Sequence, residues 1–197
     1  MAAALQNRDD AQSEPFVADE LETSRLRLRM FTPEDLDDLC VMSSDPEVMR
    51  FIGRGLPLTR DETHMNLTSI INVFRRRGFG RWALVRKETG ALAGYCGLVH
   101  GSEEVGVEIA YMLSRGEWGK GLATEAARAC LRYGFERLKL DSIAALTRPD
   151  NLRSRRVMER LGMKYRRAGQ HHGYSCVCYA IARVEWHPDG YVYRIIC

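Results

Sequence analysis

The chain has 197 residues, 45% hydrophobic and 28% charged, so it is long enough to bury one sizeable core without disulfides or metals. The formal net charge of +3 is too small to indicate a nucleic-acid-binding protein. Basic residues nevertheless gather in two clusters, Arg75 to Arg77 and a looser group between 153 and 167. Each cluster is either a solvated face or a contact with an anionic partner, and we expect no direct nucleic-acid binding.

The cysteines and the N-terminus indicate a reducing location. None of the six cysteines has CxxC spacing, and no Cys/His group has a zinc pattern, so we expect free thiols and no metal. The reactivity of Cys197 is left open. The segment MAAALQNRDD lacks the features of a signal peptide, and no stretch approaches the ~20 apolar residues of a membrane span. We therefore expect a cytoplasmic protein without a membrane partner.

The first part of the chain predicts one strand and two helices. From Glu22, the segment ETSRLRLRMF alternates apolar and basic residues, which is typical of a half-buried strand. Thr32 and Pro33 suit the N-cap and the first position of a helix. Thr59 to Glu62, TRDE, is a capping box for a second helix, which we expect to end near Gly78.

The remaining sequence alternates predicted strands and helices. In chain order these are strands at 81–87 and 91–99 joined by a tight turn, a strand at 105–113, a helix at 122–138, a strand at 142–147, a helix ending at Leu161-Gly162, and two or three final strands. This order indicates one mixed α/β structure in layers.

We divide the chain into three parts. Residues 1–19 are expected to be a flexible leader, and residues 20–186 a single domain. Residues 187–197, HPDGYVYRIIC, alternate apolar and polar positions after a turn, which predicts an extra edge strand. Such a strand either pairs across a homodimer or covers a cleft, and the sequence leaves both open.

Two glycines stand where a helix should begin. Gly119 and Gly121 lie between a buried strand ending near Leu113 and the helix beginning near Leu122. Glycine lets the backbone turn its N–H groups outward, and the first N–H groups of a helix have no internal partner. Together with the helix dipole and the charge of Lys120, they would suit a phosphate. A tight turn without a ligand is the alternative.

Two common phosphate motifs do not fit this turn. The dinucleotide fingerprint G-x-G-x-x-G fails because Thr124 occupies the third glycine position. It also requires an acid after the next strand, where Arg148 stands instead; Asp141 precedes that strand. The P-loop pattern is absent as well. Any phosphate bound here therefore belongs to a different cofactor.

The turn resembles a loop of the GCN5-related N-acetyltransferases (GNAT). Residues 118–123, WGKGLA, are similar to its Q/R-x-x-G-x-G/A pattern, with Trp118 in the Gln/Arg slot and Ala123 in the last slot. The branch typified by the RimJ/RimL ribosomal-protein N-terminal acetyltransferases resembles four more segments in order: LETSRLRLRMFTPEDLDDL, SDPEVMRFIG, VEIAYML and NLRSRRVMERLGMKY. Met163 replaces the usual Phe in the last. The resemblance covers about residues 21–186.

The resemblance implies an α/β fold with a mixed, mostly antiparallel sheet. The sheet is splayed between the strands before and after the cofactor-binding helix, and helices cover both faces. The implied cosubstrate is acetyl-CoA, whose pyrophosphate would meet the loop amides and whose pantothenate would pair with the preceding strand. The implied cofactor residues are Tyr111, Met112, Leu113, Trp118, Gly119, Lys120, Gly121, Leu122, Ala123, Asn151 and Arg156. Arg156 is otherwise ordinary surface charge.

The family's chemistry is attack of a primary amine on a thioester, which requires a base and benefits from an acid. Glu108 is the only ionisable group besides Tyr111 between Val105 and Leu113, and the branch often has Glu there. Desolvation beside the cofactor would raise its pKa, which favours a base. A glutamate on the exposed face of the strand is the alternative.

Ser154 and Asn151 are the candidate acids. They open the helix after the 142–147 strand, at the far side of the implied splay. Many relatives use a Tyr in this element where the chain has Met158, which shifts the expectation to Ser154. Helix capping alone is the alternative for both residues.

Several other residues have two readings. Tyr174, Tyr179, His171 and His172 would border the acceptor cleft, with the histidines as a second base or as exposed turn residues. Trp82 is either a cleft wall or core. The sequence thus predicts an N-acetyltransferase for a protein N-terminus or a small amine; a non-catalytic acyl-CoA-binding module on the same fold is the alternative.

Overall fold

The computed structural model describes residues 19–171, 173–188, 190 and 193–196. The expected leader up to residue 18, His172 and Cys197 lie outside the described residues.

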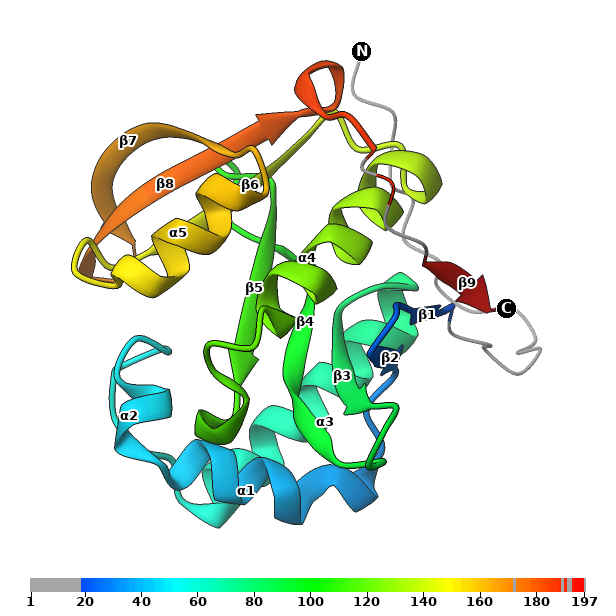
Figure 1. The fold of residues 1–197 in the computed structure, drawn as a ribbon. Coiled ribbons are helices and arrows are strands. Elements are labelled where there is room, and N and C mark those ends of the chain that lie inside the picture. The colour runs from blue at the N-terminus through cyan, green and yellow to red at the C-terminus, as the bar shows by residue number, and fades with distance from the viewer. Residues whose placement is uncertain (1–18, 172, 189, 191–192, 197) are drawn as a thin grey trace.

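The described strands form one nine-stranded sheet (Figure 1). Its order is β7-β8-β6-β5-β4-β3-β2-β1-β9, and neighbours are antiparallel except for β5 and β6. The strands are β1 (Glu20–Glu22), β2 (Leu26–Arg29), β3 (Arg81–Arg86), β4 (Leu92–His100), β5 (Val107–Leu113), β6 (Ser142–Thr147), β7 (Lys164–His171), β8 (Tyr174–Ala182) and β9 (Arg194–Ile196). The predicted fold class is confirmed.

The sheet is splayed between β5 and β6. These parallel strands pair at one register position, Glu108 with Ala144, whereas β5 pairs with β4 at seven positions. Beyond Glu108 the two strands have no further register pair, and α4, which follows β5 in the chain, packs on β4 and β5 (Figure 1). The splay predicted from the resemblance is therefore confirmed.

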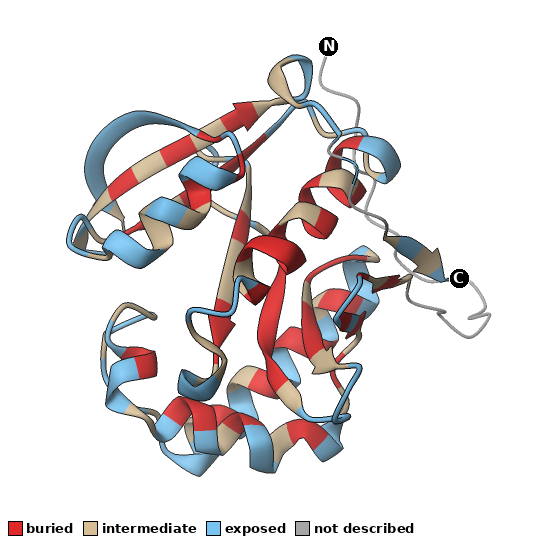
Figure 2. Cartoon of the chain, viewed as in Figure 1, coloured by how far each residue is buried: buried red, intermediate tan, exposed pale blue. Residues whose placement is uncertain are grey.

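Helices cover both faces of the sheet. The helices are α1 (Leu36–Ser44), α2 (Pro46–Met49), α3 (Arg60–Arg77), α4 (Leu122–Arg132) and α5 (Leu152–Arg160). The first three pack with Tyr95 and Met112 in one core cluster. The other two pack in a second cluster, where Ala126, Ala127 and Ala129 of α4 are almost fully buried (Figure 2). Small side chains let this helix lie close to β4 and β5.

Local signals explain several helix ends. Thr59 and Glu62 form the predicted capping box of α3, with both N–H···O contacts present, at 2.9 and 3.2 Å. Gly78 ends this helix at φ 76°, in the left-handed region that favours glycine. Pro33 begins a short 3-10 turn that leads directly into α1, and the Asp35 carboxylate accepts from the Thr32 N–H at 2.8 Å.

Two predicted boundaries were wrong. The expected strand from Glu22 is two strands, because Thr23 closes a turn in which its N–H donates to the Leu26 carbonyl, at 2.9 Å. The expected helix at 122–138 ends as α-helix at Arg132 and continues as a π-helical turn over Tyr133–Arg137. Gly134 in that turn lies so close to Ile143 that a Cβ would sit 2.7 Å from its Cδ1.

The C-terminal segment lies at the sheet edge furthest from the splay. β9 pairs with β1 of the same chain, with Leu21 opposite Ile195. Five strands separate β9 from β6, so this segment does not cover the splay.

Candidate active site

The turn after β5 is closed by a tryptophan. The Trp118 indole Nε1 donates to the Leu113 carbonyl, at 2.9 Å, and a short 3-10 turn over Arg115–Glu117 fills the loop between them. The residue in the Gln/Arg slot therefore fixes the end of the strand. The Leu113 carbonyl already has this partner, which leaves the backbone of Tyr111 and Met112 for the expected pairing.

Both glycines of the turn adopt left-handed backbone conformations. Gly119 has φ 77° and Gly121, the N-cap of α4, has φ 78°. Nothing lies within 4 Å of a Cβ built on Gly119, so backbone conformation rather than close packing requires glycine there. In the described part of the chain, the N–H groups of Gly119, Lys120 and Gly121 have no acceptor.

The amides of the turn continue into those of the helix. The N–H groups of Leu122 and Ala123 begin α4 and have no intrahelical partner by geometry. Leu122 itself is buried, so only its backbone faces outward. Consecutive free amides at the positive end of a helix suit an anion, and they fit the pyrophosphate of acetyl-CoA.

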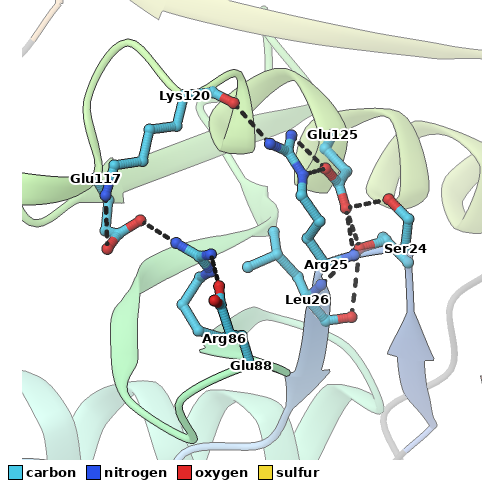
Figure 3. A network of polar contacts seen from close by, with 9 residues as sticks. Ser24, Arg25, Leu26, Arg86, Glu88, Glu117, Lys120 and Glu125 are labelled. Atoms are coloured by element: carbon cyan, nitrogen blue, oxygen red, sulfur yellow. Dashed lines mark hydrogen bonds and ion pairs between the residues drawn. The ribbon is translucent and has the colours of Figure 1, made fainter.

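A buried carboxylate anchors the start of α4 (Figure 3). Glu125 accepts from the Thr23 hydroxyl at 2.6 Å and pairs with the Arg25 guanidinium at 2.6 Å. Arg25 also donates to the Lys120 carbonyl, at 2.9 Å. Burial opposes ionisation of Glu125, but the hydrogen bonds from Thr23 and Arg25 outweigh it and lower its pKa. The turn is thereby tied to β2.

A second ion-pair group holds the other side of the turn (Figure 3). Arg86 of β3 pairs with Glu117 at 2.7 Å, and Lys120 pairs with the same carboxylate at 3.3 Å. The Lys120 charge, expected to face the anion, is thus shared with Glu117. The roles of four residues were not predicted from the sequence: Arg25, Arg86, Glu117 and Glu125. Of these, only Glu125 gave a sequence signal, as an acid on the apolar face of a helix.

Two candidate site residues meet across the splay. Tyr111 of β5 lies 2.8 Å from the Ser154 hydroxyl of α5, and its hydroxyl also lies 3.2 Å from the Ser154 carbonyl. Burial raises the pKa of Tyr111 well above its ordinary value, so the phenol stays protonated and can donate. When the phenol donates to the hydroxyl oxygen of Ser154, the hydroxyl proton of Ser154 is available to another acceptor.

Asn151 is the N-cap of α5. Its side-chain oxygen accepts from the Ser154 N–H at 3.2 Å, and its amide nitrogen donates to the Thr147 hydroxyl at 3.0 Å. Asn151 therefore caps α5, and its catalytic and cofactor-binding roles stay predictions. The Ser154 hydroxyl instead faces Tyr111.

Basic residues of α5 lie on the same side as the turn. The Arg153 guanidinium lies 4.8 Å from the centre of the Trp118 ring, a cation–π contact that joins α5 to the glycine turn. Arg156 is exposed and has no partner among the described residues. Most of the cluster between 153 and 167 has partners: Arg155 with Tyr179, Lys164 and Arg166 with Glu185, and Arg167 with Glu104.

Glu108 lies where the two strands separate. It is half-buried and opposes Ala144 at the single β5–β6 pairing. Ala110 and Met112 alternate with Tyr111 along β5 and pack in the α1–α3 cluster, so Glu108 faces that side. Glu108 and Ser154 thus approach the splay from opposite faces of the sheet.

The remaining candidates fall outside this arrangement. Trp82 is fully buried between Phe74 and Tyr133, so it is core. Tyr179 is buried and contacts Arg155 of α5. His171 ends β7, opposite Tyr174 at the start of β8.

The described residues contain neither a metal-binding cluster nor a membrane-spanning helix. No group of three or more His, Cys, Asp or Glu side chains there could hold a metal ion. No helix in those ranges is long and apolar enough to cross a membrane.

The family model described as "Acetyltransferase (GNAT) domain" matches residues 25–164. The chain belongs to the GNAT acetyltransferases. It is therefore an acyltransferase, and GNAT acetyltransferases use acetyl-CoA. The matched range contains the glycine turn, Glu108 and Ser154.

The curated relatives match about three quarters of this chain. The uncharacterized protein YkkB of Bacillus subtilis (strain 168) is 39% identical over 150 residues, 74% of this chain and 85% of its own. The uncharacterized N-acetyltransferase p20 of Bacillus licheniformis is 36% identical over 146 residues, 73% and 82% of the two chains. The FsC-acetyl coenzyme A-N(2)-transacetylase of Aspergillus fumigatus is 32% identical over 154 residues, 74% and 65%.

Solved structures share the fold. A GNAT acetyltransferase from Bacillus anthracis has a TM-score of 0.74 and 27% identity, covering 84% of this chain and 99% of its own. RimL, a ribosomal L7/L12 alpha-N-protein acetyltransferase in complex with coenzyme A, has a TM-score of 0.69 and covers 81% and 95%. Its identity of 16% shows the fold alone.

Proposed function

We propose that this enzyme transfers the acetyl group of acetyl-CoA to a protein N-terminal α-amine, as the RimJ/RimL branch does. The observation that carries the acetyl-CoA part is the row of unpaired amides at the start of α4, in a turn whose glycines have positive φ. The four branch-like segments support the acceptor class. A small-molecule amine is the competing acceptor.

The chain's own groups would hold acetyl-CoA along the splay. Amides of Gly119 to Ala123 would bind the pyrophosphate, and the β5 backbone at Tyr111 and Met112 would pair with the pantothenate. Arg156, exposed on α5, would meet a phosphate oxygen. When bound, acetyl-CoA supplies the acetyl group as a thioester.

Glu108 and Ser154 would handle the protons. Glu108 is the base that takes a proton from the incoming ammonium, directly or through water, on the α1–α3 side of the sheet. Ser154 is the acid that gives its hydroxyl proton to the departing sulfur; this role requires Tyr111 to be the donor in the 2.8 Å contact between the two hydroxyls, in which either oxygen can donate. The two transfers occur from opposite sides of the splay, so they do not compete for one site.

Glu108→Gln tests this assignment. The variant should keep its acetyl-CoA-induced rise in unfolding temperature, whereas thiol release with N-terminal peptides should fall at least 100-fold. Glu104→Gln is the matched control, because Glu104 is exposed in the turn before β5 and pairs with Arg167 on the surface. Unchanged turnover in Glu108→Gln would remove Glu108 from the mechanism.

The acceptor class is tested with the same assay. Thiol release is measured against a panel of N-terminal peptides and a panel of small primary amines. Faster turnover of the small amines would replace the protein acceptor. Acetyl-CoA binding without turnover of any amine would favour the binding-module alternative.

A further inference from the structure

Arg148 spans the open end of the splay. It follows β6, and its guanidinium donates to the Gly53 carbonyl, at 3.2 Å. The same group lies 4.5 Å from the centre of the Tyr174 ring, at the start of β8. Gly53 follows α2, which lies across the splay from the beginning of β8 (Figure 1). One cation therefore contacts both sides of the opening.

Arg148 has no carboxylate partner within the described ranges. Arg25, Arg29 and Arg86 each pair with a glutamate or aspartate within 2.7 Å. Arg148 uses one of its five N–H donors on a carbonyl and offers its face to an aromatic ring. A guanidinium with unused donors suits a carboxylate, which it can bind through two parallel hydrogen bonds.

The fold leaves little room for a side chain at Gly55 on the Gly53 side of this guanidinium. A Cβ built on Gly55 would lie 3.1 Å from Arg148 Nη2 and 3.0 Å from the Arg50 carbonyl. Gly55 also has φ 80°, so both its conformation and its neighbours favour glycine. The bare backbone of this loop thus lets Arg148 reach Gly53.

Arg148 follows the strand that passes Glu108. Glu108 opposes Ala144, and Arg148 lies four residues further along the chain. Ala144 and Leu146 of β6 face the side of the sheet on which Glu108 lies, and Arg148 is the first residue after this strand. Cys176 of β8 responds to both charges: burial raises the pKa of its thiol, Arg148 lowers it and Glu108 raises it again.

The distance between Glu108 and Arg148 determines which residue of an extended acceptor peptide can reach Arg148. Four residues of extended strand span roughly 13 Å, at about 3.3 Å per residue. An extended peptide whose α-amine lies at Glu108 would therefore bring its third or fourth residue to Arg148.

We infer that Arg148 binds an anionic group of the acceptor, and that the enzyme prefers N-terminal peptides with an acidic side chain at the third or fourth residue. This inference rests on the proposed function. Arg148 is then a specificity-determining residue, whereas a purely structural strut between Gly53 and Tyr174 would not distinguish charged from neutral acceptors.

Matched peptides test the inference. Two pairs of C-terminally amidated peptides carry Glu or Gln at the third or the fourth residue, and kcat/KM is measured by thiol release. Their affinity for the CoA-loaded enzyme is measured by calorimetry. The wild type should favour one Glu peptide over its Gln partner by about tenfold in both measurements.

Variants assign the preference to the guanidinium. Arg148→Ala should bring the Glu/Gln ratio to about one, Arg148→Lys should retain part of it, and Arg148→Glu should favour a Lys peptide instead. Arg160→Gln, at the exposed end of α5, is the control and should keep the wild-type ratio. Each variant is first checked for an unchanged unfolding temperature with acetyl-CoA.

The outcomes separate this inference from the proposed function. Equal rates for Glu and Gln peptides, or a preference that survives Arg148→Ala, would overturn the role of Arg148 and leave the peptide acceptor intact. If peptides are not acetylated, the rates for free amino acids are compared with the rates for their amides. A preference for the free carboxylate that is lost in Arg148→Ala supports anion binding by Arg148. Equal rates for acids and amides in the wild type refute it. No turnover of any amine would end both proposals.

Discussion

The two sides of the splay differ in the kind and the number of side-chain contacts that hold them in place. On the β5 side, the glycine turn is tied to β2 and β3 by Arg25 with Glu125 and by Arg86 with Glu117. On the β6 side, α5 reaches across through the hydroxyl pair of Tyr111 and Ser154 and through the ring contact of Arg153. Ion pairs therefore hold the β5 side, whereas the β6 side is held by one hydroxyl–hydroxyl contact and one cation–π contact.

This difference matches the proposed function, in which the β5 side holds acetyl-CoA and the β6 side holds the acceptor. The proposed pyrophosphate site would benefit from amides that already point at the ligand, and the ion pairs hold the turn in one conformation. The β6 side carries Arg148 and Arg153 without carboxylate partners in the described chain, so its charges can serve a ligand. Three substitutions test whether this contrast is real.

Glu125→Gln should have the largest effect. It leaves Arg25 beside a neutral side chain at a site where the carboxylate is 6% exposed and the guanidinium 45%. The free energy of unfolding should fall by about 2 kcal/mol, less than for a fully buried pair. Urea unfolding measures this loss. Glu136→Gln, which breaks an exposed pair with Arg132 near the same helix, should cost less than about 0.5 kcal/mol.

The Glu125 effect should also depend on pH. The folded pKa of Glu125 is lowered, so its contribution is fully present above the ordinary value of 4.5 and disappears as pH falls through the folded pKa. The stability difference between wild type and Glu125→Gln should therefore shrink below pH 4.5. A difference that stays constant in urea unfolding down to the acid transition would show that the carboxylate acts by shape alone.

Gly121→Ala should have an intermediate effect. A Cβ at φ 78° strains the backbone, which costs about 1 kcal/mol, and it disturbs the amides at the start of α4. Unfolding free energy and acetyl-CoA affinity should both fall. Gly116→Ala is the control, because Gly116 has no positive φ and nothing lies within 4 Å of its Cβ position. If the two variants behave alike, the left-handed conformation is not what the turn requires.

Arg153→Ala should have the smallest effect on folding. Its contact with Trp118 is exposed, so urea unfolding should change little, whereas acetyl-CoA affinity measured by calorimetry should fall a few-fold. Arg160→Ala on the same helix should change neither. A large loss of stability would mean that the α5 side is held as firmly as the β5 side.

Local features of this fold could be predicted because they depend on neighbours in sequence. The capping box at Thr59, the glycine that ends α3 and the paired glycines before α4 each follow from the conformations that those residues prefer. The splay did not follow from periodicity; it came from the resemblance. Asn151 was correctly placed at a helix start, with capping as one reading.

The anchors of the turn could not be predicted, because they join distant segments. Arg25 and Glu125 are 100 residues apart, and Arg148 and Gly53 are 95 apart. Such contacts depend on which strands become neighbours, and that is set by the whole sheet. The break between β1 and β2 was missed because Thr23 continues a polar pattern while its hydroxyl serves Glu125.

The single register position between β5 and β6 has a consequence for cooperativity. One hydrogen-bonded unit contains β1–β5 with β9, and the other contains β6–β8. Side chains from both units meet beneath α4, including Leu98 of the first and Ile143 and Val177 of the second. Cooperative unfolding of the two units therefore depends on this apolar packing together with the few side-chain contacts across the splay, and the splay is the natural boundary for partial unfolding.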